Sequence, residues 1–208
     1  GIYFSRRVLP ELTVEAGTDL RTSALMRYKG DQKQNNYSMP HVDTSTPGEY
    51  KVDIYVSPLT YHATITVVDT KAPILTLQDL EVWYGTELTV EDFITELTDA
   101  TKVEATFDTA PDVYTCGQQM IQITATDMAG HKTSQTATLT VNGVKAQVEV
   151  NLGAETLPAA SEFLADEYLA VLEGQGITVD QISFAEELTI DTNVPGEYPV
   201  QIMAGDQT

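Results

Sequence analysis

The sequence TPGEYKVDIYV, residues 46–56, decides the fold because its pattern recurs near the other end of the chain as VPGEYPVQIMA, residues 194–204. In both copies Pro-Gly-Glu-Tyr precedes apolar residues at alternate positions. Proline fixes φ and glycine permits a turn, so the motif predicts a corner that leads into a strand with one buried face. Tyr50 and Tyr198 should begin the inward row, with the hydroxyl tying the corner. The motif is therefore structural, not catalytic.

Two further motifs show that the chain repeats itself. Gly17 recurs as Gly85 and Gly153, 68 residues apart both times, and the phenylalanines of EDFI (91–94) and SEFL (161–164) lie 70 residues apart. A fixed period of this length is the signature of tandem domains. The sequence therefore predicts three repeats, at residues 1–70, 71–143 and 144–208, which we call repeats 1, 2 and 3.

Apolar and polar residues alternate over residues 51–56, 63–67, 122–126 and 136–141. Short alternating runs rich in Thr, Val and Ile, with turns at residues 57–60 and 127–132, predict an all-β fold of three tandem β-sandwich modules in an elongated array. Residues 161–173 have helical spacing instead and predict a short helix that begins at Ser161 and ends at Gly174. A turn of helix is expected at the matching place, residues 91–97.

Repeat 3 is expected to be incomplete. Eighteen residues lead from Tyr50 to Val68 in repeat 1, but only ten follow Tyr198. These ten allow for a hairpin turn in MAGDQT, residues 203–208, but not for its return strand. We therefore expect either that the native chain continues or that its tail is left out of this sequence.

Together these motifs resemble the tandem bacterial immunoglobulin-like domains of Gram-positive cell-surface proteins. The resemblance spans nearly the whole chain and is best in repeat 2, although His131 stands where the family usually has asparagine. Its motifs are DTKAP (69–73), the Gly-Thr step (85–86), DFI (92–94), PGEY (47–50 and 195–198), TDMAGHK (126–132) and TLTV (138–141).

The resemblance implies a non-catalytic module of a larger bacterial surface protein that serves as spacer, display element or adhesion module. Two alternatives stay open. The chain could be an accessory region of a surface enzyme whose catalytic domain lies outside it, or an adhesin that binds carbohydrate or protein. Fold alone does not decide among them.

The net charge of −20 limits the partners. Repeat 1 carries −1, repeat 2 −8 and repeat 3 −11. Such a chain is repelled by nucleic acids and anionic membrane surfaces, which excludes nucleic acid as a partner and leaves a protein or glycan open. No apolar run approaches the roughly 18 residues that span a bilayer. Ile2–Phe4, followed by two arginines, could end a membrane anchor or signal upstream of residue 1, or could be an ordinary first strand.

The sequence predicts no catalytic site and no cofactor. His41, His62 and His131 lack the spacing and partners of a zinc site. Cys116 can form no disulfide within the chain, and an acidic repeat should raise its pKa, so we interpret it as a small core or turn residue rather than a nucleophile. The glycine and serine motifs of nucleotide-binding proteins and hydrolases are absent from the sequence.

Calcium is the sharpest metal hypothesis, with Asp69, Asp127 and Asp206 near junctions and hairpin tips as candidate ligands. No Asp-x-Asp-x-Asp loop supports it, so solvated loop acids are the simpler interpretation. Trp83 and Tyr84 are candidates for a sugar or protein platform, although a tryptophan in a strand more often packs between sheets. The Gln/Asn-rich loop at residues 27–42 is a second place for an adhesive contact.

An isopeptide crosslink is a further alternative from the same family. It would join a buried lysine to an asparagine beside an acidic residue. Lys132 or Lys145 with Asn142 or Asn151 are the conceivable participants. No lysine stands plainly at an inward strand position, so the sequence favours an uncrosslinked core.

Overall fold

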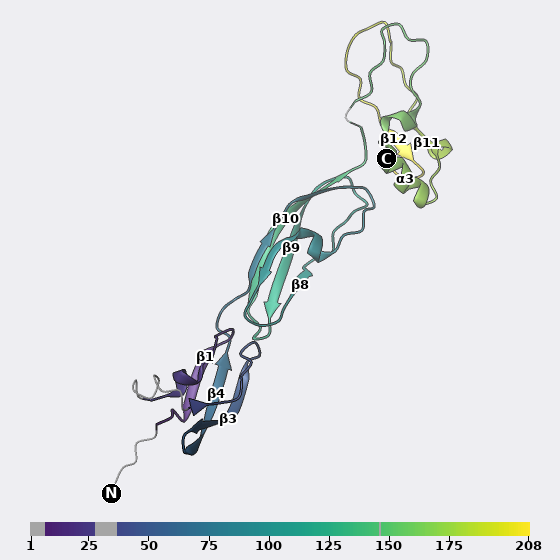
Figure 1. Cartoon of the computed structure of the whole chain (residues 1–208). Coiled ribbons are helices and arrows are strands. Elements are labelled where there is room, and N and C mark those ends of the chain that lie inside the picture. Colours follow the sequence, from purple (N-terminus) through teal and green to yellow (C-terminus); the bar gives the residue numbers. More distant parts are fainter. Residues whose placement is uncertain (1–6, 28–36, 146) are drawn as a thin grey trace. The chain divides into compact units, whose positions relative to one another are not determined.

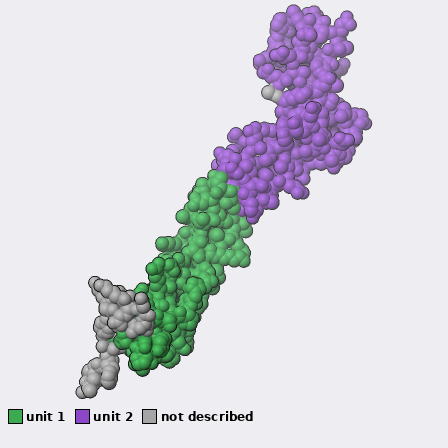
Figure 2. Space-filling view, viewed as in Figure 1, with its two compact units in different colours: residues 1–77, 94–108, 122–136 green, residues 78–93, 109–121, 137–208 purple. Residues whose placement is uncertain are grey.

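The structure is a computed structural model that describes residues 7–27, 37–145 and 147–208. The N-terminal stretch before Arg7 and most of the loop at residues 27–42 lie outside the described residues. The chain forms two compact units, coloured in Figure 2: residues 1–77, 94–108 and 122–136 make the first, and residues 78–93, 109–121 and 137–208 make the second. The units therefore divide the chain differently from the sequence repeats.

Repeat 1 forms a four-stranded sheet in the order β1-β4-β3-β2 (Figure 1). Strand β1 pairs parallel to β4, and β4 pairs antiparallel to β3, which β2 extends. The predicted turn at residues 57–60 is confirmed, because β3 ends and β4 begins there. The elements are β1 (Glu11–Glu15), η1 (Thr22–Leu25), β2 (Tyr37–Ser38), β3 (Gly48–Val56) and β4 (Leu59–Val68).

Repeat 2 has the same strand order, β6-β10-β9-β8, and adds a second sheet, β5-β7. As β1 does with β4 in repeat 1, β6 pairs parallel to the last strand of the repeat, β10. Strands β9 and β10 meet at the predicted hairpin and run through both compact units. The elements are β5 (Ile74–Leu77), β6 (Leu80–Trp83), α2 (Val90–Phe93), β7 (Ile94–Thr98), β8 (Val103–Phe107), β9 (Gly117–Asp127) and β10 (Lys132–Asn142).

Repeat 3 has few strands. Its only described sheet joins β11 to β12, which pair antiparallel. Figure 1 draws the rest of the repeat as short helices and plain trace. The elements are η2 (Ala160–Phe163), α3 (Asp166–Gly174), η3 (Val179–Gln181), β11 (Ile182–Phe184) and β12 (Ile202–Ala204).

The predicted helix at residues 161–173 is in fact two shorter helices, η2 and α3. Leu164 lies between them in an extended conformation, because it is buried and forms a β-bridge with Val144. Helix α3 ends at Gly174, as predicted, but Gly176, at φ +84°, takes the left-handed position after the helix, and Ile177 N donates to Leu172 O at 2.9 Å. The turn of helix expected at residues 91–97 is α2, which gives way to β7 at Ile94.

The predicted inward rows form the cores. Val52, Ile54 and Val56 of β3 are buried, with Ile54 fully so, while the residues between them are exposed. In β9 the same alternation buries Ile121 and Ile123. The structure is therefore mostly β with few helices, which is the all-β class that the sequence predicts.

One turn recurs in all three repeats and explains the glycine spacing. Gly17, Gly85 and Gly153 all have φ between +76° and +82°, where a Cβ is strained. The N–H of Gly17 donates to the carbonyl of Thr44 at 3.0 Å, that of Gly85 to Val113 at 2.8 Å and that of Gly153 to Thr192 at 2.8 Å. Each acceptor lies four residues before another glycine: Gly48, Gly117 or Gly196. The glycines thus mark a common corner, which follows β1 in repeat 1 and β6 in repeat 2.

The tyrosine ties predicted from Pro-Gly-Glu-Tyr are confirmed. Tyr50 Oη donates to the Thr46 carbonyl at 2.6 Å, and Tyr198 Oη donates to the Val194 carbonyl at 2.8 Å. Repeat 2 has Gln119 at this place. Its side-chain amide donates to the carbonyl of Asp112 at 2.6 Å and accepts from that residue's N–H at 2.9 Å, so it ties the corner by a different group.

Candidate functional site

Five polar residues meet where repeat 1 leads into repeat 2, all within the first compact unit. Asp69 follows β4, Asp99 and Thr101 lie between β7 and β8, Asp127 ends β9, and His131 lies in the β9–β10 turn. We call these five residues the junction cluster. Asp69, Thr101 and Asp127 are buried. Burial is unusual for carboxylates, and every buried polar side chain needs hydrogen-bond partners.

Thr101 connects the carboxylates of the junction cluster. Its hydroxyl lies 2.8 Å from Oδ2 of Asp99 and 3.2 Å from Oδ2 of Asp69, and it accepts from the N–H of Met128 at 3.4 Å. The other oxygen of Asp69 accepts from the N–H of Lys71 at 3.2 Å. One buried hydroxyl therefore joins the end of repeat 1 to two loops of repeat 2.

His131 holds the second buried carboxylate. Its N–H donates to Oδ1 of Asp127 at 2.8 Å, and its Nδ1 lies 3.0 Å from Oδ2 of the same residue. The Asp127 side chain is fully buried, while that of His131 is 38% exposed. The β9–β10 turn thus folds back over Asp127, and the partly exposed His131 side chain is the part of the junction cluster that faces solvent.

Contacts around the junction cluster join the same segments. Both carboxylate oxygens of Glu15, at the end of β1, accept from Thr70: one from its N–H at 2.8 Å and one from its hydroxyl at 2.9 Å. A Cβ built on Gly17 would lie 3.1 Å from the Cβ of Ala100, so the glycine corner lies directly against the β7–β8 loop. Repeat 1 and the adjoining part of repeat 2 are therefore in contact at several points.

The two buried carboxyls differ in their proton affinity. Burial is the largest cause that raises the pKa of Asp69; the facing carboxylates of Asp127 and Asp99 raise it further, while the hydrogen bonds from Lys71 and Thr101 lower it in part. Burial also acts to raise the pKa of Asp127. Hydrogen bonds from the backbone and ring of His131 and from Asp69 outweigh it, and the pKa of Asp127 is lowered. Asp69 therefore holds a proton more tightly and can donate it to Asp127.

A metal ion is a second way to hold the same residues together. One ligand atom each from Asp69, Asp127 and His131 lies within 4.8 Å of the others. Calcium prefers six to eight oxygen ligands, and here all four carboxylate oxygens of the two aspartates already accept hydrogen bonds. The donor set therefore fits a proton-sharing hydrogen-bond network better than a calcium cage, and calcium at these residues stays a prediction to be tested.

The remaining predicted residues are not gathered at this site. Asp206 is exposed in the turn after β12 and is not part of the junction cluster. Trp83 is 37% exposed on the outward row of β6. Tyr84 is 2% exposed, so its ring cannot serve as an exposed platform. Of the predicted binding pair, only Trp83 is accessible.

Tyr84 instead belongs to an aromatic group in the second compact unit. Its ring packs edge to face on Tyr114 and Tyr168, at centroid distances of 5.5 and 5.0 Å, and its hydroxyl donates to Oε1 of Gln207 at 3.1 Å. Cys116 is exposed, as a turn residue can be, and partial burial of its sulfur raises the thiol pKa. A raised pKa disfavours the thiolate, which argues against a nucleophile.

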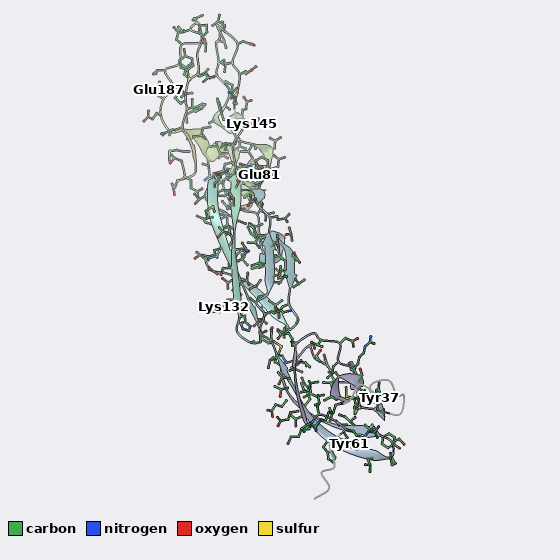
Figure 3. All side chains as sticks on the ribbon, turned by 90° about the vertical axis from the view of Figure 1, so that its left-hand side faces the viewer. Tyr37, Tyr61, Glu81, Lys132, Lys145 and Glu187 are labelled. Atoms are coloured by element: carbon green, nitrogen blue, oxygen red, sulfur yellow. The ribbon has the colours of Figure 1, made fainter. Side chains whose placement is uncertain are left out.

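The lysines considered for a crosslink are on the surface. Figure 3 labels Lys132 and Lys145, and both are exposed. Asn142 donates instead to Oε1 of Glu81, also labelled in Figure 3, at 2.5 Å. A buried lysine, which such a bond requires, is not among these candidates.

Sequence reasoning missed Asp99, Thr101 and His131 as partners of the two aspartates. The signal for Asp99 and Thr101 was the polar run Thr-Asp-Ala-Thr at residues 98–101, between two strands. Nothing in the sequence shows that this loop meets the β9–β10 turn, because the contact depends on the pairing of β8 with β9, in which Val103 lies opposite Asp127.

No family model and no curated protein matches this chain. Solved structures that resemble it include a Rib structure from Streptococcus pyogenes, at 17% identity over 35% of this chain and 92% of that one, with a TM-score of 0.29. Human mucin-like protocadherin EC1-2 matches at 12% identity over 64% and 96%, with a TM-score of 0.29. Mouse clustered PcdhgC3 EC1-3 matches at 12% over 67% of both chains, with a TM-score of 0.30. Scores this low carry no argument about fold or function.

Within the described residues, no helix is both long and apolar enough to cross a membrane.

Proposed function

We propose that this chain is a non-catalytic spacer from an extracellular bacterial surface protein, and that its work is to hold neighbouring domains at a fixed distance. A spacer needs stable modules and junctions that resist bending. The bacterial surface location comes from the sequence resemblance, on which display and adhesion functions also rest.

The junction cluster is the observation that carries this proposal. Domains joined by a polar linker that makes no contacts are free to move. Interfaces between domains are usually small and polar, so relative motion is the default expectation. Here the link residue Asp69 is buried and hydrogen-bonded to a loop of the next repeat, and Thr70 is held by Glu15 of β1. Such contacts restrict the hinge between repeats 1 and 2.

Small-angle X-ray scattering of the 208-residue chain tests the proposal. The native chain should give an extended profile, and Thr101→Val should increase its flexibility, because the variant removes the hydroxyl that joins the two carboxylates. Thr106→Val, at an exposed position of β8, is the matched control and should leave the profile unchanged. A compact native profile, or equal flexibility of the native chain and Thr101→Val, would contradict a stiff spacer.

A further inference from the structure

Helix α3, labelled in Figure 1, and the chain that follows it line a groove of about 260 Å³ in repeat 3. We call it the α3 groove, and all of its residues belong to the second compact unit. The helix contributes four residues at i, i+3, i+4 and i+7, which share one helix face: Asp166, Leu169, Ala170 and Glu173. The chain after the helix contributes the other four: Ile177, Thr178, Val179 and Ile182.

The α3 groove is apolar inside and small. Ile182 is buried, Leu169 and Ile177 are half-buried, and Val179 is 59% exposed. Pockets that enclose a drug-sized ligand hold roughly 300–1,000 Å³. A volume of about 260 Å³ is below that range and suits one or two apolar side chains of a peptide.

Backbone hydrogen bonds hold the lining segments in place. Ile177 N donates to Leu172 O at 2.9 Å, which fixes the chain where it leaves α3. Gln181 N donates to Thr178 O at 2.9 Å within η3, and Gly205 N donates to Gln181 O at 3.1 Å, which ties η3 to the turn after β12. Because the groove is already formed, an occupant binds without a large cost for ordering it.

Charge decides which kind of peptide the α3 groove accepts. Asp166 and Glu173 are exposed in its lining, and seven helical residues separate them by about 10 Å along the axis. Repeat 3 has a charge of −11, and its residues 147–208 contain no lysine, arginine or histidine. Lys145 is the one basic residue in the sequence of the second compact unit. The complementary occupant is therefore cationic.

We propose that the α3 groove docks a basic segment of another protein, with apolar side chains in the groove and lysine or arginine beside Asp166 and Glu173. An extended peptide advances about 3.3 Å per residue, so cations three residues apart span the two carboxylates. The segment therefore carries the pattern basic-apolar-apolar-basic. This docking surface adds a partner to the spacer and does not depend on the stiffness of the first junction.

Peptide titration of the native 208-residue chain, followed by its backbone amide chemical shifts, tests the proposal. The probe is the capped peptide Lys-Lys-Leu-Leu-Lys-Lys, which should shift the amides of Leu169, Ala170 and Val179 saturably. The peptide Lys-Lys-Ser-Ser-Lys-Lys has the same charge without the apolar side chains. It should bind at least about tenfold more weakly, because burial of leucine supplies most of the affinity.

A pair of double variants tests the two carboxylates. Asp166→Asn with Glu173→Gln should weaken binding of the leucine peptide by about three- to tenfold, since exposed ion pairs are individually weak. Glu186→Gln with Glu187→Gln is the matched control. It removes the same charge from exposed positions outside the groove, of which Figure 3 labels Glu187, and should leave the affinity unchanged.

Four results would overturn the proposal. Equal affinity for the two peptides, or equal weakening by the two double variants, would reduce the binding to attraction by net charge. Saturable shifts at other residues only would place the contact elsewhere. If spermine shifted the same amides as strongly as the leucine peptide, the groove would bind small cations instead. Should the first double variant not fold, the two peptides on the native chain decide: preference for leucine at the groove amides supports the proposal, and no preference refutes it.

Discussion

At the residue scale, the feature that most needs explanation is a pair of buried aspartates in a chain with a net charge of −20. Asp69 and Asp127 differ in proton affinity. The pKa of Asp69 is raised, chiefly by burial, and that of Asp127 is lowered by the hydrogen bonds from His131 and Asp69, so Asp69 takes up a proton at a higher pH than Asp127 does. Thr101 and His131 supply the remaining donors.

The opposite shifts predict a stability maximum at mildly acidic pH. Because the folded-state pKa of Asp69 is raised, its contribution is complete below the ordinary carboxyl pKa of about 4 and is lost as pH rises through the folded value. Because the pKa of Asp127 is lowered, its contribution is present above that ordinary value and is lost as pH falls through the folded one. The thermal unfolding midpoint should therefore be highest near the ordinary carboxyl pKa and should fall as the pH is moved away from it in either direction.

Two aspartate variants separate these contributions. Asp69→Asn imitates the protonated carboxyl, so the unfolding midpoint of this variant should fall less as the pH rises toward neutrality. Asp127→Asn replaces one of the two oxygens that face His131 with an amide donor, so one of the two hydrogen bonds is lost and the unfolding midpoint at neutral pH should fall. Asp206→Asn is the control, because Asp206 is exposed and lies outside the junction cluster, and its unfolding midpoints should match those of the native chain. If calcium or zinc stabilises the native chain but not Asp69→Asn, the junction cluster is a cation site and the proton-sharing account is wrong.

At the element scale, the sequence predicted most of the strands because their alternation is local. The runs that became β3, β4, β9 and β10, and the two hairpin turns, follow from the period of two. The break between η2 and α3 could not be predicted, because it depends on the bridge of Leu164 to Val144, twenty residues away. The burial of Tyr84 likewise depends on Tyr168, from a distant helix.

The glycine corners give a prediction at the same scale. Alanine at Gly85 or Gly153 meets the same left-handed strain, about 1–2 kcal/mol. A Cβ on Gly85 would also lie 2.5 Å from Cγ1 of Val171, whereas one on Gly153 meets only Asn193 Oδ1, at 3.5 Å. Urea unfolding should therefore show a larger loss for Gly85→Ala than for Gly153→Ala. Equal losses would mean that α3 does not pack on this corner.

At the scale of the whole molecule, the glycine corner recurs in all three repeats, the tyrosine tie in repeats 1 and 3, and the sheet order in repeats 1 and 2. The sequence predicted this repetition from the glycine and Pro-Gly-Glu-Tyr spacings. It also named Asp69 and Asp127 without showing that they meet, because residues from three separate loops form the junction cluster. These contacts, rather than any reactive group, support a mechanical role.

Nuclear magnetic relaxation of backbone amides in the native 208-residue chain tests the central claim of a stiff first junction most directly. The described strands of repeat 1, β1 to β4, and the strands β5, β7 and β8 of repeat 2 should share one rotational correlation time, because the junction cluster joins them within one compact unit. Two distinct correlation times, one for each repeat, would show that the modules move independently and would contradict the spacer account.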